Sequence, residues 1–297
     1  MSQAIIAMLA DRGVVSVTGP DARAFLDNLV TNDMDLLETQ EAIHAALLSP
    51  QGKILFAFFI VRTPAGFLLE TGLDQTAALA KRLSMYKLRA KVEIKDAAGE
   101  VVVVVSQGDV RARPQGAITF VDPRSERLGD RVLLPAPMVG ELLGRMGAER
   151  MLPQAYHGQR IGLGVPEAGL DYALGDTFPH EANFDRFNGV SFTKGCFVGQ
   201  EVVARMQHKT VVRKRIVRVT GAGTLRSGAD IAIGDVVIGR VGSVSGRGAL
   251  AMLRLDRVAE AADKGQTLTS EGTAITVEDE AMERYRASVA EREALGA

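Results

Sequence analysis

Two hydrophobic stretches joined by a short turn most constrain the fold of this 297-residue chain. Ile43–Leu48 and Ile54–Val61 flank the sequence Ser-Pro-Gln-Gly-Lys at 49–53, where proline and glycine favour a tight turn. A second turn at 63–66 leads into the shorter stretch Phe67–Glu70. Because consecutive strands joined by tight turns pair with their neighbours, the sequence predicts an antiparallel meander.

Helix and strand patterns flank this meander. Val14–Thr18 reads as a strand, and Asp21 is a candidate cap for the helix that follows it. A helix is predicted from Gln75 to Tyr86, followed by a strand at Val92–Ile94. Helices on one face of an antiparallel sheet give an α+β lobe, which we place at residues 1–97.

The same order of elements is predicted a second time, over residues 98–212. The run Val101–Val105 is apolar throughout, as in a strand that is covered on both faces. The other predicted elements of this lobe are strands at Ile118–Val121 and Val132–Leu134 and helices at Val139–Met146 and Tyr156–Leu163. A second α+β lobe is therefore expected.

Helix patterns stop at Ile216 in this interpretation. Three strands are predicted, at Ile216–Thr220, Val236–Ser245 and Leu250–Leu255, among many glycines. We predict a small β-barrel over residues 213–279. Residues 280–297 carry alternating charges and are expected to form a surface helix or a frayed tail.

Composition limits the functional classes. A single cysteine in the chain excludes an internal disulfide framework and fits a reducing compartment. The net charge of −1 gives no general attraction to nucleic acid or to a membrane. No apolar run reaches the roughly 20 residues that a membrane span needs, and the first ten residues carry no visible export or import signal. A cytoplasmic protein without a membrane partner is expected.

The only cysteine, Cys196, lies in the octet Lys194–Glu201, which reads Lys-Gly-Cys-Phe-Val-Gly-Gln-Glu. Gly195 and Gly199 allow the backbone to turn sharply and to approach a ligand closely. A helix is predicted from Glu201, with an ion pair to Arg205. A thiol beside a lysine and a helix N-terminus should have a lowered pKa, which favours a functional thiolate.

This octet resembles the signature of the YgfZ family of folate-binding proteins that maintain iron–sulfur clusters, relatives of the glycine-cleavage aminomethyltransferase. All the fixed positions of Lys-Gly-Cys-aromatic-x-Gly-Gln-Glu are present. Weaker similarity extends to 18–26, 48–53 and 164–167. The resemblance implies two interlocked α+β lobes with antiparallel sheets, as in the aminomethyltransferase, and a C-terminal β-barrel.

The resemblance also implies ligands and partners. Tetrahydrofolate or a derivative is the implied cofactor, although the chain has no tryptophan and offers Arg12 and Tyr156 where the best-known member has tryptophans. The implied site residues are Cys196 and Lys194 for the thiolate chemistry and Tyr156, Gly195, Gly199, Gln200, Glu201 and Arg205 for the cofactor.

A cluster role follows from the same residues. Because one cysteine cannot supply the four ligands that a cluster normally takes, we infer that Cys196 is one ligand of a shared, transient iron–sulfur cluster. The implied partners are A-type carrier proteins and client iron–sulfur enzymes, including radical enzymes that modify tRNA. Contact with tRNA itself would be indirect.

The segment Gly164–Asn188 reads as a long loop with six acidic or histidine side chains. These residues are Glu167, Asp171, Asp176, His180, Glu181 and Asp185. Because no second histidine or thiolate stands at zinc-ligand spacing, we reject a zinc site and interpret them as solvated loop charge. A thiol hydrolase that pairs Cys196 with His180 or His208 stays conceivable.

Basic residues gather after the octet, at Arg205, His208, Lys209, Arg213, Lys214, Arg215 and Arg218. They predict either a solvated face or an anion site for a folate glutamate tail or an RNA phosphate. Two other functions therefore stay open. One is a folate-dependent aminomethyltransferase that transfers a one-carbon unit, and the other is a tRNA-binding module, although aromatic residues for base stacking are missing from the basic run.

Overall fold

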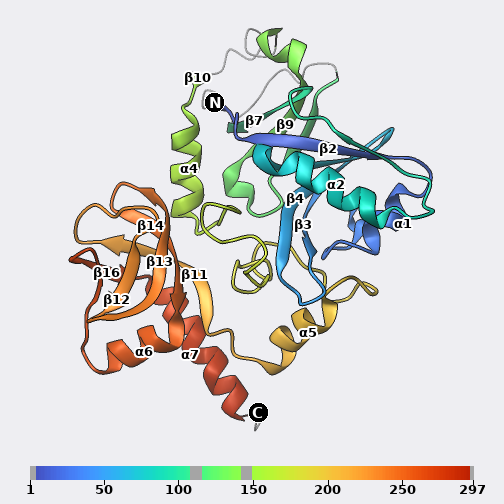
Figure 1. The fold of residues 1–297 in the computed structure, drawn as a ribbon. Helices are drawn as coiled ribbons and strands as arrows, with labels where there is room; N and C mark the ends of the chain where they lie inside the picture. Colours follow the sequence, from blue (N-terminus) through green and yellow to red (C-terminus); the bar gives the residue numbers. More distant parts are fainter. Residues whose placement is uncertain (1–4, 108–115, 142–148, 295–297) are drawn as a thin grey trace. The chain divides into compact units, whose positions relative to one another are not determined.

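The computed structural model describes residues 5–107, 116–141 and 149–294. Figure 1 shows two sheets with flanking helices, followed along the chain by a barrel. The chain divides into two compact units. The first unit comprises residues 1–48, 55–156 and 187–198, and the second comprises 49–54, 157–186 and 199–297.

The first sheet contains the predicted meander. Its strand order is β3–β4–β5–β2–β6, and β5 pairs antiparallel with β4 and β2, as does β2 with β6. The strands are β2 (Arg12–Thr18), β3 (Ala42–Leu48), β4 (Ile54–Thr63), β5 (Gly66–Gly72) and β6 (Glu93–Asp96). The predicted pairing of three consecutive strands is confirmed, because β3, β4 and β5 are neighbours.

Helices α1 (Ala22–Asp27) and α2 (Thr76–Tyr86) contribute to the core of this sheet. Leu79 and Leu83 of α2 are buried four residues apart, on one helical face. Asp21 is the N-cap residue of α1, as predicted, but its side chain forms no capping hydrogen bond. Its carboxylate instead accepts a hydrogen bond from the backbone N–H of Lys91 at 2.7 Å, which ties the start of α1 to the approach of β6. The short 3₁₀ helices are η1 (Met34–Glu38) and η2 (Leu73–Gln75).

The second sheet has the order β10–β1–β7–β9–β8. The strands are β1 (Ile5–Met8), β7 (Val101–Gln107), β8 (Ile118–Val121), β9 (Asp130–Pro135) and β10 (Glu149–Arg150). Strand β1 pairs antiparallel with β7, so a segment from the predicted 1–97 lobe completes the sheet of the next lobe. Because β2 follows β1 in the chain and lies in the first sheet, this segment links the two sheets.

Helix α4 (Pro153–Gly162) matches the predicted helix at 156–163. The helix predicted at Val139–Met146 would begin directly after η4 (Ala136–Met138), and its residues 142–146 lie outside the described part of the chain. A further 3₁₀ helix, η3 (Glu126–Leu128), precedes β9. After α4, the predicted long loop is present as a series of turns, and it leads through the cysteine octet into α5 (Gln200–Lys209).

The C-terminal strands close into a six-stranded barrel, as predicted in outline. Their order is β11–β14–β13–β12–β15–β16, and β11 pairs with β16 to close the ring. The strands are β11 (Lys214–Gly221), β12 (Asp230–Ile233), β13 (Val236–Ser245), β14 (Gly248–Arg254), β15 (Leu268–Ser270) and β16 (Thr273–Val277).

Two helices accompany the barrel. The prediction that helix patterns stop at Ile216 was wrong, because α6 (Leu255–Asp263) buries Leu255, Val258 and Ala261 at helical spacing against the barrel core. The charged tail forms α7 (Asp279–Ala294), which is mostly exposed. Among the described residues, no helix has the length and apolar character of a membrane span.

Candidate functional site

Cys196 is a free and exposed cysteine. It lies in an irregular stretch four residues before the first residue of α5, so the predicted position just before a helix start is confirmed. The exposed thiol is flanked by the buried side chains of Lys194 and Phe197. The loop therefore presents its sulfur outward while its neighbours anchor the backbone.

Lys194 anchors the loop to the end of α1. Its ammonium nitrogen lies 2.6 Å from the carbonyl oxygen of Asp27, 3.1 Å from that of Val30 and 2.9 Å from that of Asn32. It also forms an ion pair with the carboxylate of Asp27 at 3.0 Å. A lysine has only three N–H donors, so these four acceptors use all of its capacity. We expected the lysine to supply a charge to the sulfur, but the structure directs its ammonium group into this carbonyl cluster.

The chain that leads into the octet is fixed to the same segment. The hydroxyl of Thr31 donates to the carbonyl oxygen of Gly189 at 2.6 Å, and the side-chain amide of Asn32 donates to that of Asn188 at 2.8 Å. The backbone N–H of Ser191 donates to the carbonyl oxygen of Thr31 at 3.0 Å. Thr31 and Asn32 are buried, so these bonds are shielded from water.

The two glycines of the octet play different parts. Gly199 has a φ of 83° and is the N-cap residue of α5, a left-handed conformation that favours glycine. A side chain added at Gly195 would meet no atom within 4 Å, and its φ is not positive. The space beside Cys196 is thus open at residue 195, and the turn is made at residue 199.

The remaining octet positions lie at the start of α5. Gln200 is half-buried, and Glu201 is exposed. Glu201 forms the predicted ion pair with Arg205 at 3.2 Å, on the exposed face of the helix. Val203 is the buried residue of α5, whereas Val202 and Met206 are half-buried.

Tyr156 lies in the interior of the first unit. Its ring is 1% exposed, and its hydroxyl oxygen lies within 3.0 Å of Arg124 Nη2 and 2.8 Å of Arg131 Nη1. Arg12, the other position considered for pterin stacking, donates from Nε to Glu70 Oε1 at 2.9 Å and lies over the ring of Phe59. A pterin needs an exposed ring face, so neither residue fits a stacking partner for folate in this structure.

These residues belong to a buried ionic network that the sequence patterns did not reveal. Glu70 pairs with Arg12 and Arg131, and Asp122 pairs with Arg124 and Arg131. Burial opposes ionisation of Glu70, but the positive charges of Arg131 and Arg12 outweigh it and lower the pKa of this carboxyl group. Burial likewise opposes ionisation of Asp122, and Arg124 and then Arg131 lower its pKa.

Phe59 forms an apolar wall of this network. The guanidinium carbons of Arg124 and Arg131 lie 4.8 and 4.7 Å from its ring centroid. One sequence signal could have located part of the network, because Glu70 directly follows the apolar run Phe67–Leu69 inside β5. Such a charge beside an apolar run indicates a buried ion pair.

Our interpretation of the long loop as solvated charge was wrong for several residues. Asp171 is buried and pairs with Arg160 at 2.7 Å, and its carboxylate also accepts from the backbone N–H of Ser243 at 2.7 Å. Asp185 pairs with the buried Arg215 at 2.8 Å. These acids join α4 and the loop to the barrel strands β13 and β11 within the second unit.

The other loop residues divide between the surface and the interior. Asp176 is 77% exposed, as predicted, whereas Glu181 accepts a hydrogen bond from the backbone N–H of Phe178. His180 is buried, and its Nε2 lies 3.0 Å from Oε1 of Gln207 on α5. Burial lowers the pKa of His180. Within the described ranges, no three His, Cys, Asp or Glu side chains gather as a metal site would require.

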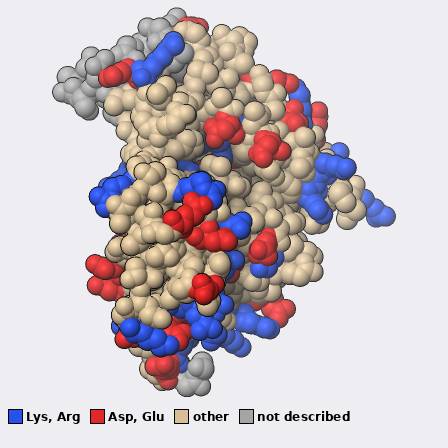
Figure 2. Space-filling view, turned by 60° about the vertical axis from the view of Figure 1, so that its left-hand side comes forward, with Lys and Arg blue, Asp and Glu red and all other residues tan. Residues whose placement is uncertain are grey.

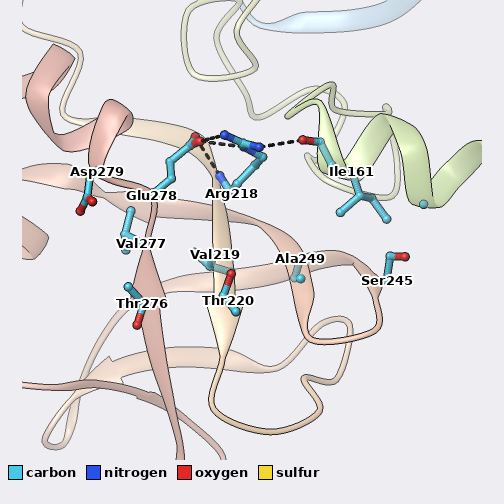
Figure 3. A pocket seen from close by; sticks show the side chains of 13 residues that line it. Ile161, Arg218, Val219, Thr220, Ser245, Ala249, Thr276, Val277, Glu278 and Asp279 are labelled. Carbon is cyan, nitrogen blue, oxygen red and sulfur yellow. Dashed lines mark hydrogen bonds and ion pairs between the residues drawn. The ribbon is translucent and has the colours of Figure 1, made fainter. Parts of the chain in front are cut away.

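The basic run after the octet divides into paired and unpaired residues. Arg215 is buried against Asp185 and Asn183. Arg218 lies between Glu278, at 2.7 Å from Nε to Oε2, and the carbonyl oxygen of Gly162, at 2.7 Å from Nη1 (Figure 3). The pair lies at the edge of a pocket of about 420 Å³ beside the barrel, and Figure 3 shows the side chains that line it. Lys209 and Arg213 are exposed, and Lys214 is half-buried.

The surface charge is mixed. Figure 2 shows acidic and basic side chains interspersed over one face of the protein, which agrees with a net charge of −1. Any attraction of this protein for an anion must therefore come from a local cluster.

Comparison with known proteins identifies the barrel first. Residues 213–283 match the family model of the CAF17 C-terminal beta-barrel domain. The fold is similar to that of the glycine cleavage system aminomethyltransferase T from Bartonella henselae, with a TM-score of 0.74 over 94% of this chain and 86% of that chain. At 19% sequence identity this similarity concerns the fold alone. It confirms the predicted α+β architecture with its C-terminal barrel.

Three relatives are similar in sequence over most of the chain. The iron-sulfur cluster assembly factor IBA57 of Mus musculus is 36% identical over 244 residues, covering 73% of this chain and 66% of the relative. The Homo sapiens protein of that name is 34% identical, covering 70% and 64%, and its Mycosarcoma maydis homologue is 35% identical, covering 71% and 56%.

The chain thus spans between about half and two thirds of the length of these relatives. Their names describe all three as mitochondrial proteins. Together with the predicted YgfZ-like octet, the matches in sequence, barrel and fold lead to one conclusion: the chain belongs to the IBA57/CAF17 family.

Proposed function

We propose that this protein assists the assembly or repair of iron–sulfur clusters, with Cys196 as one ligand of a cluster that it shares with a carrier protein. The observation that supports this function best is an exposed thiol on a loop whose neighbouring residues are anchored. The relatives are named as cluster assembly factors, which agrees with the proposal.

The shared ligation follows from ligand counting. An iron–sulfur cluster normally takes four protein ligands, and the described residues contain no cluster of His, Cys, Asp or Glu around Cys196 that could complete such a set. The missing ligands would come from the partner, for which we propose an A-type carrier. The thiol must lose its proton to bind iron, so it would act as a thiolate ligand.

Anaerobic cluster transfer tests this function. A [2Fe–2S]-loaded A-type carrier is mixed with the protein, and the movement of the cluster into an apo-ferredoxin is followed by circular dichroism. We expect Cys196→Ser to abolish the stimulation given by wild type. As a matched control, C196S/S84C carries its thiol on an exposed position of α2. Restored transfer in that double variant would show that any surface thiol suffices, which contradicts the proposal.

Tetrahydrofolate binding is a second, separate proposal. It is supported by the sequence resemblance to a folate-binding family, whereas Tyr156 and Arg12 are engaged in the ionic network. We therefore place no step of the cluster chemistry on folate. Anaerobic isothermal titration with tetrahydrofolate tests binding, and if Tyr156 is only structural, Tyr156→Phe should bind folate as wild type does.

Two other functions and the cellular setting need their own tests. Turnover with an aminomethyl-lipoyl carrier would indicate a one-carbon transferase, and salt-sensitive tRNA binding lost in R213E would indicate an RNA module.

Radical enzymes that modify tRNA are proposed as clients, and cluster occupancy of such enzymes in deletion cells tests this. The predicted cytoplasmic location contrasts with the mitochondrial relatives, and cell fractionation decides between them.

A further inference from the structure

Helix α5 borders a groove of about 650 Å³ in the second unit. Its apolar lining comes from Phe178, Val202, Met206 and the segment Val211–Val212. All of these side chains are half-buried, so the apolar surface is only partly covered. We refer to this cavity as the α5 groove. Its volume lies in the range of about 300–1,000 Å³ that is typical of ligand sites.

The rim of the α5 groove is basic. Lys209, Arg213 and Lys214 line it, and none of them forms an ion pair with a carboxylate among the residues that the structure describes. They follow one another within six positions at the end of α5 and the start of β11. Three cations that form no ion pair within the described ranges, placed around an apolar cavity, create a local positive field.

Other charged residues at the groove are already engaged. Arg254 forms a two-bond pair with Asp256, at 2.9 and 2.6 Å. Arg292 of α7 donates to the carbonyl oxygen of Gln207 at 2.8 Å. Glu181 is the acidic residue of the lining, and it is bonded to the backbone N–H of Phe178 at 2.9 Å. The charges that can meet a ligand are therefore mainly positive.

We propose that the α5 groove binds an acidic peptide segment of a partner protein, with one or two large apolar side chains between carboxylates. The apolar side chains would occupy the cavity against Val202 and Met206, and the carboxylates would pair with Arg213 and the two lysines. Charge complementarity of this kind orients a peptide and speeds its association. This surface is separate from the thiol chemistry of Cys196 and does not depend on it.

A peptide fits this groove better than RNA. Single-stranded RNA is held by stacking of successive bases on aromatic rings, and the groove has one aromatic ring, that of Phe178. The Nζ atom of Lys53 lies 3.5 Å from the centroid of this ring and covers one of its faces. The apolar part of the lining is otherwise aliphatic, which favours leucine-like or phenylalanine side chains.

Fluorescence anisotropy on the full chain tests the proposal with a fluorescein-labelled probe peptide, Asp-Glu-Leu-Phe-Glu-Asp. Two control peptides replace either Leu-Phe by Ser-Ser or the four acids by lysine. We expect the probe alone to bind, and R213E and M206S each to weaken binding by about tenfold. The matched control is Lys81→Glu, an exposed lysine of α2 that lies in the other unit and lines none of the groove. It should bind like wild type.

Each outcome of this experiment either supports or contradicts peptide binding at the α5 groove. An equal loss in K81E, or equal binding of the Ser-Ser peptide, would reduce the effect to general electrostatics and overturn the proposal. Displacement of the probe by a uridine oligonucleotide at lower concentration would overturn it in favour of RNA. Thermal melts verify that the variants fold. If M206S does not fold, K209E serves as a second variant of the groove lining. Cys196→Ala should bind the probe like wild type, so failure of the cluster function leaves this test valid.

Discussion

The ammonium nitrogen of Lys194 lies 2.6 Å from the carbonyl oxygen of Asp27, the last residue of α1. The last carbonyl groups of a helix have no partner within the helix. Lys194 satisfies one of them, and two carbonyls of the following segment, from 162 to 167 positions away in the sequence. A positive charge at a helix C-terminus is also favourable electrostatically. Lys194, two residues before Cys196, thus satisfies the end of α1 and anchors the loop that precedes α5.

Replacing Lys194 by methionine should destabilise the protein. The change leaves the carbonyls of Asp27, Val30 and Asn32 without their donor, and each unsatisfied buried group costs about 1–3 kcal/mol. We expect a fall in the free energy of unfolding of about 3 kcal/mol and slower cluster transfer by the folded fraction. Urea denaturation measures the change in the free energy of unfolding. Lys264→Met, at an exposed pair on α6, is the control, and an equal effect of both changes would contradict the anchoring role.

The two octet glycines should respond differently to alanine. Gly199→Ala forces a side chain into a left-handed conformation and should cost about 1 kcal/mol. Gly195→Ala meets open space and should change stability by less than about 0.5 kcal/mol. If a carrier approaches Cys196 over residue 195, G195A should nevertheless slow cluster transfer. Thermal melts and the transfer assay separate these effects, and a destabilised G195A would show that the open space beside the thiol is misassigned.

Glu70 should make stability depend on pH in the acid range. The pKa of Glu70 is lowered in the folded protein from its ordinary value of 4.5. The ionised carboxylate therefore contributes fully to the free energy of unfolding above pH 4.5, and this contribution is lost as the pH falls through the pKa that Glu70 has in the folded protein. Glu70→Gln removes the charge that Glu70 shares with Arg12 and Arg131, and breaking a buried pair in this way costs about 3–5 kcal/mol at neutral pH.

The measurement is the difference in unfolding free energy between wild type and E70Q. It should shrink as the pH falls below 4.5, because a protonated glutamic acid resembles glutamine. Glu201→Gln, at an exposed pair, is the control and should show little difference at any pH. A constant difference for E70Q across the acid range would mean that the pKa of Glu70 is not lowered in the folded protein.

Arg160→Met should weaken the attachment of the long loop to the barrel. Arg160 pairs with Asp171 at 2.7 Å and donates to the hydroxyl of Ser243 at 2.7 Å, inside the second unit. Breaking one side of a buried pair costs about 3–5 kcal/mol. Arg240→Met, which breaks an exposed pair with Asp230, should have little effect in the same denaturation experiment. Equal losses would contradict the role assigned to Asp171 as a buried junction.

The sequence alone predicted the elements that local patterns specify. The meander β3–β4–β5 follows from apolar stretches and turn residues that are close in the chain, and the start of α5 was placed within one residue. Helix α6 could have been predicted too, because Leu255, Val258 and Ala261 have helical spacing. The octet around Cys196 indicated the family without any structure, since its fixed positions are contiguous.

Only the tertiary structure decided the partners of charged side chains. Lys194 bonds a segment more than 160 positions away, Asp171 meets Arg160 and Ser243, and Arg131 joins Glu70 to Asp122. The sequence pattern around a charged residue is the same whether its side chain is solvated or paired with an opposite charge. Burial and pairing depend on which distant segments pack together, so the roles of these residues followed from the fold, whereas the strands, helices and the cysteine loop followed from the order of residues.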